Sequence, residues 1–191
     1  MDRVAHRRPG ATLLSAVAVL LAGTLAGCTA TASPGGGPDP AGGSPPGGTE
    51  ESGYLAEPIS PFADDWAITG LEPGLRAALH AAAEDAAADG VELVVTSGRR
   101  SAGYQQELLD HAIREYGSEE EARRWVSTPE LSRHVTGEAV DIGYTDGADW
   151  MVRNGARYGL CQTYANEMWH FERVVAPGEV CPAARPDAST G

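Results

Sequence analysis

The sequence predicts a single domain of the α+β class, because helical and strand patterns follow one another along the chain without regular alternation. Apolar residues recur three and four positions apart in some segments, as on one face of a helix. In other segments they alternate with polar residues, as in a strand. No internal repeat is found. Of the 191 residues, those from about 54 to 182 carry these patterns, which is enough for one domain.

Helical patterns occupy four segments. The first is an Ala-rich run that begins near Pro73 and stops at Gly90, with Leu75 and Leu79 on its apolar face. The third opens at Ser118 with a capping-box pattern, in which a glutamate follows three residues later. We expect helices over residues 73–89, 102–116, 119–126 and 150–158.

Strand patterns occupy three shorter segments. The first alternates from Val91 onward, and the second, Ala139–Ile142, is apolar apart from one aspartate. The stretch Ser127–Val135 is polar and is expected to be a loop or an extended lead-in, and Asp146-Gly147 a turn. We expect strands over residues 91–96, 139–142 and 169–174.

The two ends of the chain differ in composition from the part between them. Residues 1–27 are typical of a bacterial secretion signal, with arginines followed by an apolar run too short to span a membrane. Residues 28–53 are rich in Gly and Pro, which predicts a disordered tether, and residues 183–191 predict a disordered tail. The folded domain is therefore expected over residues 54–182.

The predicted signal ends in Leu25-Ala26-Gly27-Cys28, which resembles the lipobox of bacterial lipoproteins. The resemblance implies that Cys28 carries a lipid after cleavage and anchors the protein outside the cytoplasm, at the cell membrane. A plain secretion signal with an unmodified Cys28 is the alternative.

The chain is acidic, with a formal net charge of −13. This charge argues against nucleic acid as a partner, because the phosphates of nucleic acid require a basic patch. We expect the acidic charge to serve solubility, and we expect a monomer.

Cys161 and Cys181 remain as an even pair once Cys28 is assigned to the lipid. In an oxidising compartment such a pair predicts a disulfide. The bond would close a loop of about twenty residues, and in the loop-entropy model this stabilises the fold by about 3 kcal/mol. Zinc ligation is the alternative, but neither cysteine has a second thiol two residues away, as structural zinc sites usually have.

Four residues combine the side chains that a catalytic zinc site needs. Asp141 follows His134 by seven positions, and His170 follows Glu167 by three. Two imidazoles and one carboxylate can hold catalytic zinc, and a further carboxylate can take a proton from a bound water. Taken alone, Asp141 is better explained by pairing to an arginine, and each histidine by a structural role.

The chain contains two motifs in order, Ser132-x-His134-x-x-Gly137-x-Ala139-x-Asp141 and Glu167-x-Trp169-His170. Together they resemble the signature of the VanY-type D-alanyl-D-alanine carboxypeptidases. Lysostaphin-type peptidases and the Hedgehog signalling domain share their zinc-site superfamily. The segment Ser97-Gly98-Arg99-Arg100-Ser101 with Gln105 also matches, except that Arg99 stands where an aromatic residue is usual. The resemblance covers about residues 71–175.

The resemblance implies one zinc ion per chain, bound by His134, Asp141 and His170. It assigns Glu167 as the catalytic base and Arg100 as the residue that stabilises the oxyanion. It also implies that a small antiparallel sheet, flanked by helices, carries the site.

The activity implied is removal of a terminal D-amino acid, D-alanine from D-Ala-D-Ala, from peptidoglycan stem peptides. Ser132 and Gln105 match residues that contact the substrate. An L,D-carboxypeptidase or an endopeptidase on the same material is an alternative. Another is a non-catalytic, zinc-containing wall-binding module, against which Glu167 argues, since a structural site needs no free base.

Overall fold

A four-stranded antiparallel sheet lies at the centre of the molecule. The computed structural model describes residues 51–190, so Cys28 and the predicted signal and tether lie outside the described residues, apart from the end of the tether. The strands have the order β1-β2-β4-β3. They are β1 (Val94–Ser97), β2 (Ala139–Gly143), β3 (Leu160–Gln162) and β4 (His170–Arg173).

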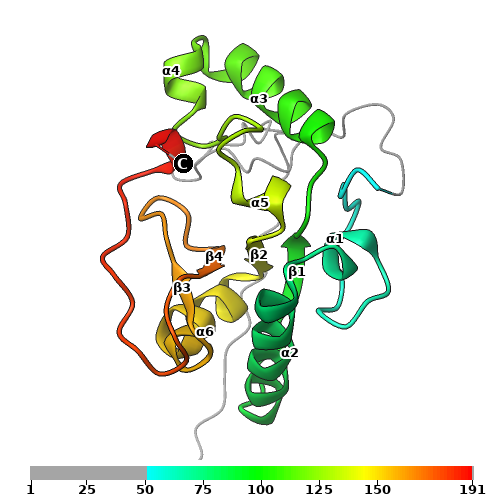
Figure 1. Cartoon of the computed structure of the whole chain (residues 1–191), viewed down its shortest axis with the longest axis vertical. Coiled ribbons are helices and arrows are strands. Elements are labelled where there is room, and N and C mark those ends of the chain that lie inside the picture. Colours follow the sequence, from blue (N-terminus) through cyan, green and yellow to red (C-terminus); the bar gives the residue numbers. More distant parts are fainter. Residues whose placement is uncertain (1–50, 191) are drawn as a thin grey trace, which may run out of the picture. The chain divides into compact units, whose positions relative to one another are not determined.

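The helices gather at two ends of this sheet. The α-helices are α1 (Trp66–Thr69), α2 (Pro73–Ala88), α3 (Ala102–Tyr116), α4 (Glu119–Ala122), α5 (Arg133–Thr136) and α6 (Thr145–Asn154). Two 3-10 turns are η1 (Gly155–Tyr158) and η2 (Ala188–Thr190). Helices α2 and α6 lie at one end, α3 and α4 at the other, and α5 between them (Figure 1). This arrangement confirms the predicted α+β class. Within residues 51–190 no helix is both long and apolar enough to cross a membrane.

The main core joins α2 and α6 to the sheet. The alternating side chains of the strands and the apolar stripe of α2 meet there, as their periods predict. Its members include Leu75, Leu79, Val95, Ile142, Met151 and Phe171. A smaller cluster joins α3 to α4 and consists of Leu109, Ala112, Ala122 and Val126. The strand residues belong to the main core and not to the smaller cluster, and all five residues of β2 are buried.

Helices α2 and α3 confirm the predicted segments, whereas α6 begins earlier than predicted. The sequence predicts a turn at Asp146-Gly147, but both residues lie in the first turn of α6. An aspartate is as favourable at a helix N-terminus as in a turn, so the residue type does not distinguish the two. The helix predicted over 150–158 is α6 followed by η1, and the one predicted over 119–126 ends at Ala122.

Helix α5 lies in a stretch for which the sequence predicts a loop. Its four residues end at Gly137, which has a φ of 79°. A Cβ at Gly137 would lie 2.7 Å from the carbonyl oxygen of Gly70, so this position requires glycine. The chain turns there directly into β2, which brings His134 of α5 beside the sheet.

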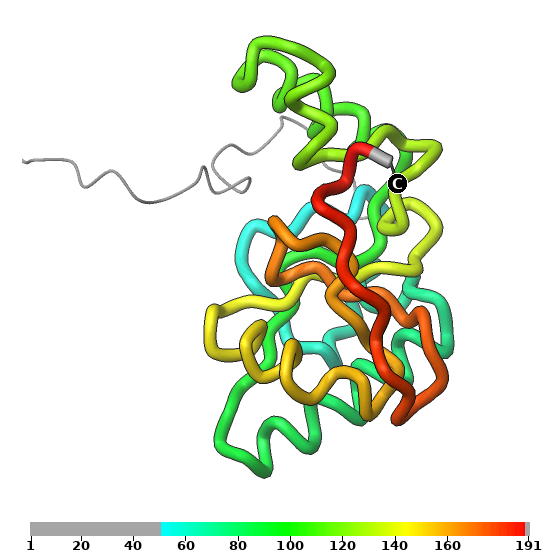
Figure 2. Tube along the Cα trace, turned by 90° about the vertical axis from the view of Figure 1, so that its left-hand side faces the viewer, coloured from blue at the N-terminus to red at the C-terminus, as the bar shows by residue number. Residues whose placement is uncertain are grey.

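Residues 181–190, here called the C-terminal strap, pack against the fold. The sequence predicts a disordered tail over residues 183–191, and the structure places residues 183–190 of it against the fold. Cys161 and Cys181 form the predicted disulfide. The Arg185 N–H donates to the Thr163 carbonyl at 2.9 Å, and Ala188 is buried. Figure 2 shows the strap in red, running along the surface from the far end of the fold to the α4 end. A covalent bond and backbone hydrogen bonds, rather than apolar composition, hold it.

Candidate metal and catalytic site

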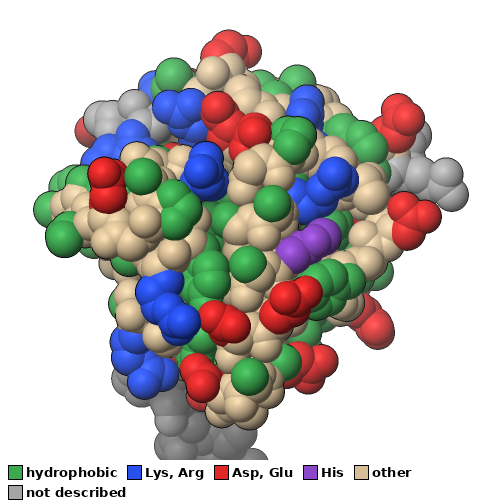
Figure 3. Space-filling view, turned by 60° about the horizontal axis from the view of Figure 1, so that its bottom comes forward, with side chains coloured by type: hydrophobic (Ala, Val, Ile, Leu, Met, Phe, Trp, Pro, Cys, Tyr) green, Lys and Arg blue, Asp and Glu red, His purple; other side chains and the backbone are tan. Residues whose placement is uncertain are grey.

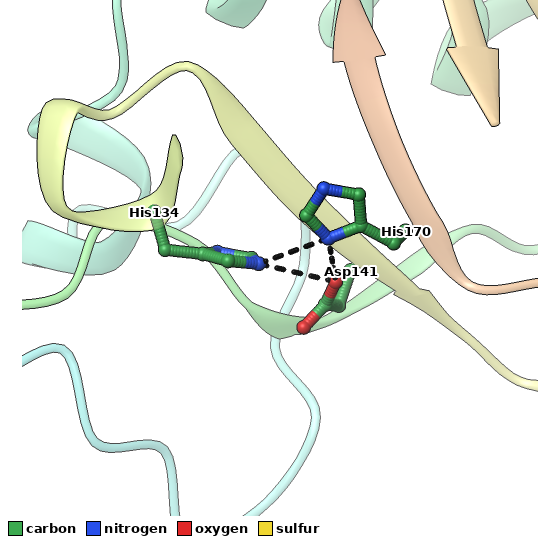
Figure 4. A group of neighbouring side chains, drawn as sticks. All are labelled: His134, Asp141 and His170. Atoms are coloured by element: carbon green, nitrogen blue, oxygen red, sulfur yellow. Dashed lines mark hydrogen bonds and ion pairs between the residues drawn. The ribbon is translucent and has the colours of Figure 1, made fainter. Parts of the chain in front are cut away.

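Three buried side chains from different elements converge on one point. His134 comes from α5, Asp141 from β2 and His170 from β4 (Figure 4). Asp141 and His170 are direct partners in the pairing of β2 with β4. The Asp141 Oδ1 atom lies 3.1 Å from His170 Nδ1 and 3.3 Å from His134 Nε2. The two imidazole nitrogens are 3.2 Å apart. Candidate ligand atoms of all three lie within 4.8 Å of one another.

The other nitrogen of each ring is fixed by a hydrogen-bond acceptor. His134 Nδ1–H donates to the Gly98 carbonyl at 2.8 Å, and His170 Nε2–H donates to Glu172 Oε1 at 3.1 Å. Because neither acceptor can donate, we assign the proton of each neutral ring to these outer nitrogens. The lone pairs of His134 Nε2 and His170 Nδ1 then point at the Asp141 carboxylate. Three electron-pair donors facing one point fit a cation.

The pKa values within the cluster agree with this interpretation. Burial and the charge of Arg100 lower the pKa of His134. Burial also opposes the charged form of His170, but hydrogen bonds to Asp141 and Glu172 raise its pKa to about 9. Burial opposes ionisation of Asp141, yet His134, His170 and Arg100 hold its pKa well below the usual range. The cluster therefore favours a positive charge at its centre, which a proton on His170 or a metal ion can supply.

Glu167 lies beside the cluster. It precedes β4 in a turn, where the His170 N–H donates to the Glu167 carbonyl at 3.3 Å. Its Oε2 atom is 3.8 Å from His170 Nδ1. Its Oε1 atom is buried and has no hydrogen-bond partner among the described residues. Burial raises the pKa of Glu167 to about 7. A carboxyl group that titrates near neutrality can both take up and return a proton.

Arg100 lies on the other side of Asp141, in the segment between β1 and α3. Its Nη2 group donates to Asp141 Oδ2 at 2.9 Å. Its Nε and Nη1 groups donate to Ser97 Oγ at 2.8 Å and to Gln105 Oε1 at 3.1 Å. These bonds use three of the five N–H donors of a guanidinium and hold its plane in one orientation.

A family model described as VanY, D-alanyl-D-alanine carboxypeptidase, matches residues 69–176, more than half of the chain. The chain belongs to this family. A D-alanyl-D-alanine carboxypeptidase of Enterococcus faecalis is 33% identical over 114 residues, which are 47% of this chain and 42% of that relative. The match thus spans less than half of the relative's length.

Two solved structures of VanY proteins resemble the fold. One is a variant of a vancomycin-resistance D,D-pentapeptidase VanY in complex with Zn(II). It has a TM-score of 0.52 and 27% identity, over 62% of this chain and 79% of that chain. The other is VanYB in complex with D-alanine-D-alanine, with a TM-score of 0.52 and 27% identity, over 62% of this chain and 77% of that chain.

Within the VanY match, the segment around Gly98 positions two residues of the site. A Cβ at Gly98 would lie 2.0 Å from the Ala67 carbonyl oxygen, so only glycine fits. Its own carbonyl accepts the His134 hydrogen bond, and the Arg100 N–H donates to the His134 carbonyl at 3.0 Å. Arg99 stands at the position where the VanY motif usually has an aromatic residue. Its guanidinium donates to the Gly70 carbonyl. Its guanidinium lies 5.7 Å from the Trp66 ring centre, outside the cluster.

The two residues expected to contact substrate lie in different settings. Gln105 is only 1% exposed, and its amide is occupied by Arg100 and by the Ser127 carbonyl, to which Nε2 donates at 2.8 Å. The structure thus places it behind Arg100, where it holds the guanidinium. Ser132 precedes α5 and is buried, and its hydroxyl makes no capping hydrogen bond to that helix. Its contact with substrate stays a prediction.

The sequence reasoning did not single out Glu172. It is buried, and it holds His170 from two positions further along β4. Residues two apart on a strand share a face, so this spacing carries the signal that could have found it. The Gly98 carbonyl had no comparable signal, because backbone acceptors are not visible in a sequence.

Proposed function

We propose that this chain is a zinc-dependent carboxypeptidase that removes the terminal D-alanine from D-Ala-D-Ala stem peptides of peptidoglycan. The observation that carries the proposal is the buried cluster of His134, Asp141 and His170, with Glu167 beside it. Membership of the VanY family supports the reaction, and the VanYB complex with D-alanine-D-alanine supports the substrate.

Zinc is the metal that this donor set fits best. Catalytic zinc is typically held by three protein side chains, of which imidazole nitrogens and carboxylate oxygens are common. A VanY structure with Zn(II) supports the choice. When bound, zinc supplies Lewis acidity toward water and toward the carbonyl oxygen of the scissile bond. His134, Asp141 and His170 would hold it.

The remaining steps belong to side chains of this chain. Glu167 accepts a proton from the attacking water as the water oxygen bonds to the carbonyl carbon. It returns that proton to the departing amine nitrogen as the carbon–nitrogen bond breaks, which frees D-alanine. Two N–H donors of Arg100 remain after its bonds to Ser97, Gln105 and Asp141. They are available for the negative charge that develops on the carbonyl oxygen.

The proposal is tested with purified soluble domain and defined pentapeptide and tetrapeptide stems, followed by mass spectrometry. We expect the pentapeptide to lose one D-alanine. A chelator should abolish this loss, and added zinc should restore it. Cleavage of the tetrapeptide in preference to the pentapeptide would instead identify an L,D-carboxypeptidase. A folded, zinc-loaded domain that cleaves neither stem nor a cross-linked dimer would contradict the enzymatic proposal.

We also propose that Cys28 is lipid-modified and holds the domain outside the cytoplasm. The lipobox pattern that ends at Cys28 supports this. Full-length protein expressed in a bacterium with lipoprotein processing should partition with membranes, and its mature N-terminal peptide should carry the mass of a lipid. Cys28→Ala should lose that mass. An unmodified Cys28 in the mature wild-type protein would refute the anchor.

A further inference from the structure

Glu172 holds the outer nitrogen of His170. Its Oε1 atom accepts from His170 Nε2 at 3.1 Å and from Thr163 Oγ1 at 2.7 Å. The side chain is 6% exposed. It does not face the three donor atoms of the cluster, so it cannot serve as a further ligand in this arrangement. Its carboxylate instead determines which nitrogen of His170 faces Asp141.

Arg185 of the C-terminal strap reaches the same carboxylate. Its Nη2 atom lies 3.7 Å from Glu172 Oε1. Its guanidinium lies 4.7 Å from the ring centre of Tyr164, and this ring lies 4.8 Å from the His170 ring. Arg185 therefore contacts two of the groups that surround His170, Glu172 and Tyr164. The strap lies beyond residues 69–176, which the VanY model matches.

A second connection joins the strap to the opposite side of the site. The hydroxyl of Ser127 donates to the Ala188 carbonyl at 2.9 Å, and its own carbonyl accepts from Gln105 Nε2 at 2.8 Å. Gln105 in turn holds Arg100, which pairs with Asp141. All the links from Ser127 to Asp141 are hydrogen bonds within the described residues.

We propose that the C-terminal strap helps to position His170 for metal binding. The positioning residues are Glu172 of β4 and Arg185 of the strap. This inference rests on the proposed function, because it requires that His134, Asp141 and His170 bind zinc. Glu172 orients the imidazole, and the charge of Arg185 keeps the carboxylate in place and Tyr164 against the ring. The disulfide between Cys161 and Cys181 holds the start of the strap near β3.

The test is the dissociation constant for zinc, measured by competition with a chromophoric chelator in the absence of substrate. Glu172→Ala should raise this constant by about 10- to 100-fold, the usual effect of removing a partner of a metal-bound histidine. Glu172→Gln should restore part of the affinity, because its amide oxygen can still accept from His170. Arg185→Ala should raise the constant by less than Glu172→Ala. Arg173→Ala removes an exposed arginine beside Glu172 and serves as the control, with affinity unchanged.

Two further measurements separate positioning from general stability. Thermal unfolding of the metal-free variants should show midpoints close to that of the wild type. At saturating zinc, kcat should recover more fully in Arg185→Ala than in Glu172→Ala, with KM little changed in both. If Glu172→Ala fails to fold, Glu172→Gln and Arg185→Ala decide the question.

The proposal is overturned if Arg185→Ala and a folded Glu172 variant both bind zinc with wild-type affinity. The Glu172 variant is Glu172→Ala or, if that one does not fold, Glu172→Gln. Weakened zinc binding in a protein whose wild type cleaves no stem peptide would support the positioning roles and count against the proposed reaction. The two failures are therefore distinguishable.

Discussion

Glu167→Gln should lower the rate of D-alanine release by about 10² to 10⁴, the usual effect of removing a positioned general base. The substitution keeps the length of the side chain but removes its ability to accept a proton. Zinc content should stay at the wild-type level, because Glu167 lies outside the three-residue cluster. Stability should stay equal or rise, since burial opposes the charged form of Glu167 and an amide has no charged form.

The measurement compares D-alanine release, zinc content and the unfolding midpoint of each variant. Glu138→Gln is the matched control, because Glu138 is an exposed carboxylate that pairs with Arg133 away from the cluster. It should turn over stem peptide like the wild type. Loss of zinc from Glu167→Gln would make Glu167 a ligand instead of a base. If Glu167→Gln keeps its zinc and turns over stem peptide at the wild-type rate, the proposed mechanism is wrong.

Arg100→Ala should lower turnover by about 10² to 10³ at saturating zinc, if its free N–H groups stabilise the developing oxyanion. Zinc affinity should also fall, because the substitution leaves Asp141 Oδ2 without the donor that lies 2.9 Å away. Arg100→Lys should restore little of the turnover, since an ammonium group cannot reproduce the three directed bonds of the guanidinium.

The neighbouring Arg99→Ala is the control for Arg100→Ala. Arg99 carries the same charge one position earlier, but it contacts Trp66 and the Gly70 carbonyl, outside the cluster. Its loss should leave turnover close to that of the wild type. Steady-state rates measured over a range of zinc concentrations separate the two effects. Full recovery of Arg100→Ala at high zinc would mean that Arg100 acts only through Asp141.

The sequence predicts the site better than it predicts the local fold around it. His134, Asp141 and His170 could be found because zinc restricts the residue types and the motifs restrict their spacing. Helix α5 could not be found, because four residues of helix leave no periodic pattern. It ends at Gly137, where a positive φ and the nearby Gly70 carbonyl, far away in the sequence, leave no room for a side chain.

The surroundings of the site depend on contacts that composition does not show. The strap has the Ala, Pro, Asp and Ser composition of a disordered tail, yet a disulfide and the hydrogen bonds of Arg185 hold it in place. Gln105 matches a family position expected to touch substrate, but its burial makes it a support for Arg100. In both cases the setting of the residues comes from packing, which composition and motif spacing do not show.

Charged side chains of both signs are scattered over the face in Figure 3. Backbone pairing with flanking segments covers part of the sheet. Ile59 exchanges two backbone hydrogen bonds with Val95 on the outer side of β1, and Arg185 pairs with the chain just after β3. Both pairing segments lie outside the 69–176 match. A chain trimmed to that match would expose the outer edge of β1, uncover the segment just after β3 and leave Cys161 with a free thiol. Open edges and free thiols are routes to self-association. We therefore expect the flanking segments also to limit self-association of the domain.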